Sequence, residues 1–342
     1  RSALLYPLLV STFLLALGYS VWAATVGWGT PIVQQYEFVQ AKAAIGAYYL
    51  AKGGPILRYE MPVLGPPWSI PYEFPFYQLL VAWTHKLAGI SLEASGRLIG
   101  KLFFYLSLFP LCLIARILGF RRFSLLIPAT LFLASPLYLF WSRQFMNEAT
   151  ATFLSLSYLA AAMFWAEMPS GKRWTLAIIL GVMAALAKST TYAGFAIAAG
   201  VFLLRPLIVR REFRSFALAK TLAMLALPLL AGILWVRFTD HVKNENPLGF
   251  PHTSAGLSLW YLHSDWSERL RGAFWNHLFR ITIHDAVGHR AVWIFSVVFA
   301  LSLGSRAWLY WLCSLLFLAA PILFTHAHMM HDYYANANAI FL

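Results

Sequence analysis

The stretch FALAKTLAMLALPLLAGILWVR, residues 216–237, decides the fold class of this chain. A helix needs about 17 to 25 mostly apolar residues to cross a hydrocarbon core of ~30 Å. The stretch has that length, and its polar and apolar residues do not alternate as in the strands of a membrane barrel. It therefore predicts a transmembrane α-helix.

Similar apolar runs recur from the beginning of the chain. The expected spans are 3–23, 97–118, 123–140, 149–165, 174–187, 190–209, 216–237, 291–303 and 307–324, with a tenth starting near Tyr333. No small-residue cleavage pattern follows the first run and further spans do, so a retained signal anchor is favoured over a signal peptide. The chain starts without Met and stops inside an apolar stretch, so we expect it to continue beyond both ends.

Composition agrees with a membrane protein. Hydrophobic residues make up 60% and charged residues 11% of the chain, against about 25% charged residues in soluble domains. The formal charge of +13 is spread over short connections and forms no basic domain, so no nucleic-acid partner is expected. Cys112 and Cys313 lie in apolar runs, which predicts neither a disulfide framework nor a thiolate metal site.

The charges predict an orientation. With the N-terminus in the cytoplasm, the inner side receives Arg1, Arg116, Arg121, Arg122, Lys172, Arg173, Arg205, Arg210, Arg211, Arg214, Lys220 and Arg306, as the positive-inside rule requires. The outer side then receives Glu37, Glu60, Glu73, Glu93, Glu148, Asp240, Glu245, Asp265, Glu268, Asp285 and Asp332, and all ten histidines lie there or at its rim. Only Glu167 and Glu212 remain inside, so we expect the active face to be extracytoplasmic.

The spans divide the chain into a first helix (1–23), an outer loop (24–96), a transmembrane bundle (97–237), a second outer loop (238–290) and further transmembrane helices (291–342). Amphipathic stretches at 31–52 and 75–87 predict helices that lie along the membrane interface in the first outer loop. Pro31 suits the start of the first of them, and Gly53 suits its end.

Two acids in the first outer loop are candidates for proton transfer. Glu37 follows the first span, and Glu73 stands in PYEFP; an acid among aromatics at a membrane surface can take a proton from an acceptor hydroxyl. The competing interpretations are a solvated helix residue for Glu37 and a helix N-terminal role for Glu73, just before the 75–87 helix.

Three charged residues lie at span boundaries. Arg143 and Glu148 lie in the outer connection between the third and fourth spans, where an ionisable residue is either functional or paired for structure. Lys188 lies between two apolar runs at the outer side, where the positive-inside rule does not explain a cation. Lys188 can hold a phosphate, or its ammonium can extend to the interface while its stem stays in lipid.

The last motif is HAHMMHDYY, residues 326–334. Its histidines and Asp332 have the chemistry of divalent-metal ligands, but their spacing matches no standard zinc motif. A hydrogen-bonding role toward a sugar or phosphate and a purely structural interfacial cluster are the alternatives. A metal cofactor thus remains open.

The order of these motifs resembles a known family. EFPFYQ at 73–78, GRL at 96–98, SPL at 135–137, RQFMNEA at 143–149 and HDYY at 331–334 are similar to bacterial relatives of protein O-mannosyltransferases and lipid A aminoarabinose transferases. These enzymes belong to the C superfamily of glycosyltransferases (GT-C). The resemblance runs from about Trp22 to the end of the chain.

The resemblance implies a GT-C-like bundle of about nine or ten transmembrane helices in a bacterial-type inner membrane. It implies inverting transfer from a polyprenyl-phosphate sugar donor to an acceptor that the sequence leaves open, with membrane lipids as neighbours. Glu37 would be the base, helped by Glu148. The other expected roles are donor phosphate binding by Lys188, Arg143 and Arg97, and substrate binding by Glu73, Tyr77, His331, Asp332 and Tyr333. Tyr36 precedes Glu37 where many relatives have an acid, and Asn147 replaces a common proline.

Two other functions compete with the transferase. A transporter of lipid-linked sugars predicts polar residues deep within several spans. A non-catalytic membrane subunit of the same fold is consistent with the missing acid beside Glu37.

Overall fold

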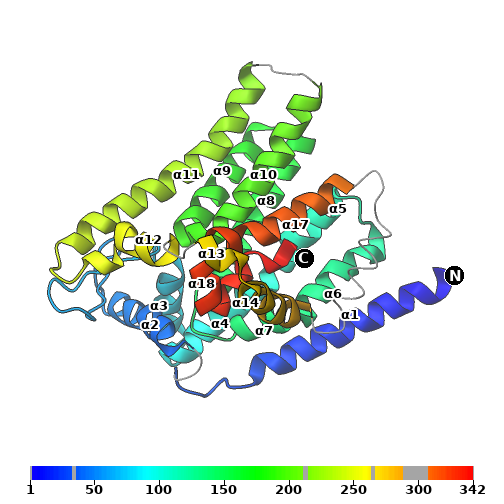
Figure 1. Cartoon of the computed structure of the whole chain (residues 1–342). Helices are drawn as coiled ribbons and strands as arrows, with labels where there is room; N and C mark the ends of the chain where they lie inside the picture. Colours follow the sequence, from blue (N-terminus) through cyan, green and yellow to red (C-terminus); the bar gives the residue numbers. More distant parts are fainter. Residues whose placement is uncertain (1, 33–35, 211–214, 263–265, 288–306, 342) are drawn as a thin grey trace.

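The structure is a computed structural model that describes residues 2–32, 36–210, 215–262, 266–287 and 307–341. Within these residues the chain is helical, with one isolated antiparallel bridge between Glu60 and Ser69 (Figure 1). The α-helices are α1 (Ser2–Thr25), α2 (Glu37–Ala51), α3 (Phe76–Ala88), α4 (Leu92–Leu106), α5 (Leu108–Ile117), α6 (Leu126–Ala134), α7 (Pro136–Trp141), α8 (Glu148–Glu167), α9 (Gly171–Ala187), α10 (Ser189–Arg210), α11 (Ser215–Asn244), α12 (Ser254–Leu262), α13 (Trp266–Leu270), α14 (Gly272–His277), α15 (His284–Val287), α17 (Ala307–Leu323) and α18 (Thr325–Met330). Short 3₁₀ turns cover Arg122–Leu125, Phe250–His252, Asp332–Ala337 and Ala339–Phe341, and a π-helix covers Leu278–Ile283.

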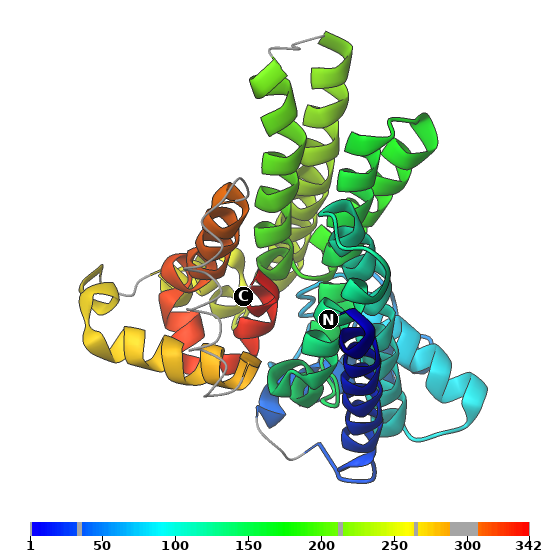
Figure 2. The same cartoon turned by 90° about the vertical axis from the view of Figure 1, so that its right-hand side faces the viewer.

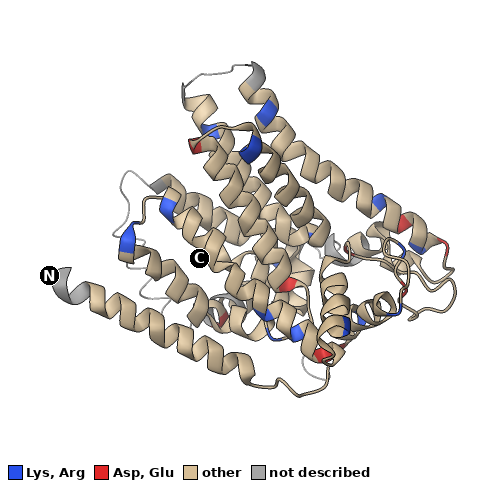
Figure 3. Cartoon of the chain, turned by 180° about the vertical axis from the view of Figure 1, so that it is seen from behind, with Lys and Arg blue, Asp and Glu red and all other residues tan. Residues whose placement is uncertain are grey.

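Five helical segments of the described chain are long and apolar enough to cross a membrane: Tyr6–Thr25, Leu92–Ile117, Glu148–Glu167, Ser189–Val209 and Ala217–Asn244. Arg122–Ala134 and Trp308–Leu323 are shorter apolar helices. Most charged segments lie in connections or near helix ends, and the middle lengths of the long helices carry few charges (Figure 3). This is the make-up of an α-helical membrane protein.

The main core lies among α8, α9, α10 and α11. Tyr158, Phe195 and Met224 are fully buried there. A Cβ on Gly181 would lie 2.7 Å from Cγ of Pro228 and 2.9 Å from the Tyr158 ring, so glycine lets α9 approach both α8 and α11 closely. α10 and α11 run side by side in both views (Figures 1 and 2).

The expected span 123–140 is wrong as a single helix. The chain forms a 3₁₀ turn, then α6, then the separate short helix α7. The break falls at Ser135, whose ψ of 117° is extended, because the ring of the following Pro136 disfavours a helical conformation in the preceding residue.

Other boundaries also differ from the prediction. α11 continues to Asn244, so residues 238–244 belong to a long helix and not to the second outer loop. The tenth span expected near Tyr333 does not begin there, because this segment forms buried 3₁₀ turns. The expected span 291–303 lies outside the described residues.

The two helices predicted in the first outer loop are present as α2 and α3. α2 begins at Glu37, later than the expected Pro31, and follows Tyr36, whose φ of 59° is left-handed. The two helices pack against each other and against α4. This layer brings residues of the first loop over the beginning of α8 and the end of α9, where the candidate site lies.

Candidate functional site

Two adjoining cavities lie where α2, α8 and α11 meet the break between α9 and α10. The small chamber, of about 120 Å³, is lined from α2, the 59–73 segment, the start of α8 and the 333–334 turn. The large chamber, of about 270 Å³, extends toward α11 and α12. Tyr72, Glu73, Lys188 and Tyr334 line both, so the two chambers adjoin each other.

Lys188 and Glu148 form a buried ion pair at the wall shared by the chambers. Glu148 is the first residue of α8, and Lys188 is the extended residue that separates α9 from α10. Their side chains are only 3% and 8% exposed. The Lys188 ammonium also lies 5.1 Å and 5.0 Å from the ring centres of Tyr333 and Tyr334. A carboxylate and two aromatic faces thus hold this cation in place.

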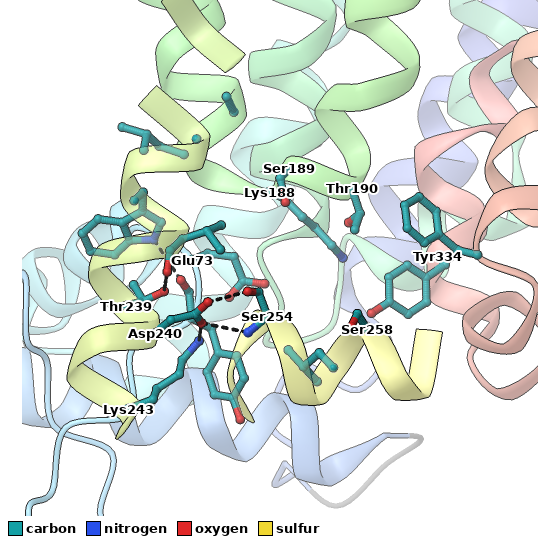
Figure 4. Close-up of a pocket in the computed structure, with 18 residues that line it drawn as sticks. Glu73, Lys188, Ser189, Thr190, Thr239, Asp240, Lys243, Ser254, Ser258 and Tyr334 are labelled. Atoms are coloured by element: carbon teal, nitrogen blue, oxygen red, sulfur yellow. Dashed lines mark hydrogen bonds and ion pairs between the residues drawn. The ribbon is translucent and has the colours of Figure 1, made fainter. Parts of the chain in front are cut away.

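Two further lysines enter the chambers from opposite elements. The ammonium of Lys42, from α2, lies 4.4 Å from the ring centre of Tyr72, and that of Lys243, from α11, lies 4.8 Å from the same ring. Lys188, from the α9–α10 break, and Lys243, from α11, both line the large chamber (Figure 4). Burial lowers the pKa of Lys42, partly offset by the nearby charge of Glu73. Cations that gather around a cavity make it attractive to an anion.

Glu73 is the acid that the two chambers share. Its backbone is fixed on both sides, because Phe74 N donates to Leu186 O at 3.0 Å and the Tyr59 hydroxyl donates to Glu73 O at 3.2 Å. In the described part of the chain, no ion pair within 4 Å involves the Glu73 carboxylate. Glu148 is paired with Lys188, and Asp240 lies 3.9 Å from the Lys243 ammonium and accepts a hydrogen bond from Ser254 N. Glu73 is therefore the acid of the site that can receive a proton without breaking an ion pair.

An apolar groove opens into the large chamber. It lies between α9, α10 and α11, has a volume of about 650 Å³, and is lined by side chains such as Ala196, Ile197, Leu225 and Leu229. The groove and the large chamber share Ala185, Ser189, Gly232, Val236 and Ser254. A molecule with a charged head and a long apolar chain would match this combination.

Glu37, the expected base, does not line either chamber. It is exposed at the start of α2, whereas Val39, Lys42 and Ala43 of the same helix line the small chamber. At about 100° per residue, Glu37 lies roughly half a turn away from these three positions. The structure therefore does not bring Glu37 to the chambers that Lys188 lines, and the predicted role of Glu37 gains no support.

Arg143 and Arg97 also lie elsewhere. The Arg143 guanidinium donates to Ala23 O at 3.1 Å, and Arg97 donates to Trp28 O at 2.6 Å. They bind the end of α1 and the turn after it, where helix carbonyls lack partners and carry partial negative charge. Arg143 does not pair with Glu148, as one interpretation of the sequence proposed. Neither arginine lines a chamber.

Tyr77 is a packing residue. It is fully buried, its hydroxyl donates to Gly96 O at 3.0 Å, and its ring meets Phe145 edge-on at 5.7 Å. Tyr77 does not line either chamber, so its predicted contact with substrate gains no support.

The 326–334 motif contributes Tyr333 and Tyr334 to the chambers, while His331 and Asp332 lie behind them. His331 stacks on Tyr333, with ring centres 5.3 Å apart. The half-buried Tyr36 has its pKa raised to about 12 by partial burial and by the charge of Asp332. Burial raises the pKa of Asp332. No group of three or more His, Cys, Asp or Glu residues in the described chain could hold a metal ion, so the motif gains no support as a metal site.

Sequence reasoning missed Lys42, Tyr72, Asp240 and Lys243. Lys42 shares a helix face with Val39 and Ala43, and this periodicity was a usable signal. Asp240 and Lys243 were placed in a loop because the apolar run ends at Arg237. The absence of Pro and Gly between 238 and 246 was the signal that α11 continues.

No protein-family model, curated protein or solved structure matches this chain. The geometry of the chambers and the groove therefore carries the functional argument.

Proposed function

We propose that this protein is a GT-C-like membrane glycosyltransferase that takes a sugar from a polyprenyl-phosphate donor at the extracytoplasmic face of a bacterial-type inner membrane. One observation carries the proposal: an apolar groove between α10 and α11 shares five lining residues with a chamber that has two buried lysines and Glu73, an acid with no ion pair among the described residues. A polyprenyl chain fits the groove, because burying its hydrocarbon there removes it from water. The bound donor would place its phosphate in the large chamber.

The cations support the leaving group. Lys188 and Lys243 both line the large chamber. As the bond from the anomeric carbon to the phosphate oxygen breaks, negative charge grows on the polyprenyl phosphate. Fixed cations in a cavity shielded from water stabilise that charge. Lys188 stays in place through Glu148, so Glu148 is a positioning residue in this proposal and not a second base.

Glu73 replaces Glu37 as the proposed base. An acceptor hydroxyl attacks the anomeric carbon from the face opposite the phosphate, its proton passes to the Glu73 carboxylate, and polyprenyl phosphate leaves. The anomeric configuration inverts. Two facts support this role: Glu73 lines both chambers, and its fixed backbone limits where the carboxylate can lie.

Radiolabelled polyprenyl-phosphate sugar, added to membranes that contain the protein, tests the proposal through the release of polyprenyl phosphate. Glu73→Gln keeps the size of the side chain and removes the base, so release should fall by about 10² to 10⁴-fold. Glu37→Gln, the matched control on the exposed side of α2, should leave release within about twofold, since it removes an ordinary surface charge.

Three outcomes would contradict the proposal. Equal release by Glu73→Gln and the parent would remove Glu73 from the reaction. Loss in Glu37→Gln alone would restore the base expected from the sequence. Movement of intact donor across the membrane without release would favour a transporter, and absence of both activities would favour a non-catalytic subunit.

A further inference from the structure

A third cavity lies at the opposite end of α8 from the chambers. It has a volume of about 810 Å³ and is lined by the end of α5, the 119–125 turn and the last residues of α8. Glu148 begins α8 and Glu167 ends it. At 1.5 Å per residue these ends are about 28 Å apart, close to the thickness of a hydrocarbon core. The third cavity and the chambers therefore lie near opposite ends of the same long helix.

Three arginines from three consecutive segments of the chain line the third cavity. Arg116 comes from the last turn of α5, Arg121 from the connection after it, and Arg122 from the next 3₁₀ turn. Glu167 is the acid in the lining. In the described part of the chain, none of these four side chains takes part in an ion pair within 4 Å. The cavity thus has an uncompensated positive charge.

A fourth arginine nearby is occupied. Arg173, from the start of α9, donates to Met168 O at 2.6 Å and lies 4.4 Å from the ring centre of Phe164. Phe164 and Met168 line the cavity, so Arg173 binds two residues of the cavity wall. The rest of the wall is apolar and includes Leu113, Ile117 and Leu125.

We propose that this cavity binds the phosphate group of an anionic phospholipid. Guanidinium groups form paired hydrogen bonds with phosphate oxygens, and basic pockets between membrane helices recognise anionic headgroups. The apolar wall would receive the first part of the acyl chains. The positive-inside rule accounts for arginines on one side of a membrane, but not for their placement around a hollow with no ion pair. This inference does not depend on the proposed transferase activity.

Native mass spectrometry of the full chain in detergent tests the inference, with phosphatidylglycerol and phosphatidylcholine as the probe lipids. The parent should retain phosphatidylglycerol more tightly than phosphatidylcholine. The triple variant Arg116→Gln/Arg121→Gln/Arg122→Gln should lose phosphatidylglycerol affinity by at least tenfold, since each cation near an anionic surface contributes about fivefold. Lys172→Gln, which removes an exposed cation at the beginning of α9, is the charge control and should change affinity less than twofold.

Glu167→Gln provides a test of opposite sign. It removes the acid from the lining, so phosphatidylglycerol affinity should rise by about threefold. Soluble glycerol 3-phosphate, which has no acyl chains, should not displace the lipid at equal concentration. Thermal melting of each variant separates lost binding from lost folding, and the gain in Glu167→Gln cannot arise from unfolding. Equal retention by parent and triple variant, equal losses in the triple variant and in Lys172→Gln, or equal retention of both lipids would overturn the inference.

Discussion

Removing one partner of the Lys188–Glu148 pair should destabilise the protein far more than removing both. Glu148→Gln leaves a nearly buried ammonium without its carboxylate, because the Lys188 side chain is only 8% exposed. Lys188→Met leaves the carboxylate alone, with only 3% of the Glu148 side chain exposed. Breaking a buried ion pair in this way costs about 3–5 kcal/mol in the free energy of unfolding. The double variant Glu148→Gln/Lys188→Met leaves neither charge unpaired. Its loss of unfolding free energy should be at least ~3 kcal/mol smaller than the sum of the two single losses.

The surface pair between Arg58 and Glu245 is the matched control. Its side chains are 47% and 35% exposed, so Arg58→Gln should cost less than about 1 kcal/mol. The aromatic rings beside Lys188 reduce the penalty in Glu148→Gln by about 1 kcal/mol, since Tyr333 and Tyr334 still face the ammonium. Lys188→Met should therefore be the more damaging single change.

Thermal unfolding in detergent, followed by tryptophan fluorescence, measures these differences. At about 2–4 °C per kcal/mol for a chain somewhat smaller than this one, each single variant should melt roughly 5–10 °C below the parent. The double variant should recover part of that loss, and Arg58→Gln should melt within about 2 °C of the parent. Strictly additive losses in the double variant, or single losses no larger than that of Arg58→Gln, would refute the buried ion pair.

Three other predictions follow from the packing. Burial lowers the pKa of His328 to about 4, so below about pH 6.5 the unfolded chain binds more protons than the folded one. The free energy of unfolding should therefore fall by up to about 3 kcal/mol between pH 6.5 and 4. His328→Phe should remove this contribution when unfolding is measured against pH. A Cβ on Gly100 would lie 2.7 Å from Ser142 O, so Gly100→Ala should cost about 1–3 kcal/mol in unfolding, whereas Gly18→Ala meets nothing within 4 Å and should cost nothing measurable. Gly232→Trp would fill the groove where it opens into the large chamber, so binding of a long-chain polyprenyl phosphate should weaken about tenfold while a donor with a single isoprene unit binds as before.

Span periodicity and helix parity predicted that Glu148 and Lys188 lie at one face, but not that they contact each other. Glu148 precedes one apolar run and Lys188 separates two others, so a single topology placed both on the same side of the membrane. The structure joins them in one ion pair. The sequence indicated a phosphate-binding or snorkelling role for Lys188, and the pairing with Glu148 comes from the structure.

Nearness in sequence misled the prediction for Arg143. This residue precedes Glu148 by one turn-forming segment, yet the turn directs its guanidinium to the carbonyls at the end of α1. Helix ends attract cations wherever their carbonyls lack partners, and the sequence gives no information on which helix end will lie nearby. The same reason applies to Arg97.

The position of Glu37 follows in part from the helical repeat. Glu37 lies roughly half a turn around α2 from Val39, Lys42 and Ala43, the residues of this helix that line the small chamber. Tyr36 turns inward instead, where it contacts Trp141 and Tyr333. Lys243 was harder to place, because hydropathy locates the apolar part of a helix and not the end of its hydrogen bonding.

Photolabelling with a polyprenyl phosphate that carries a diazirine in its isoprenoid chain tests the central claim most directly. If the groove between α10 and α11 holds the chain and the large chamber holds the phosphate, labelled peptides should contain residues 192–197 and 225–236, and Lys188→Met/Lys243→Met should reduce the labelling. Labelling confined to α1, α5 or α6 would contradict the claim. Labelling of Lys188→Met/Lys243→Met as strong as that of the parent would also contradict it.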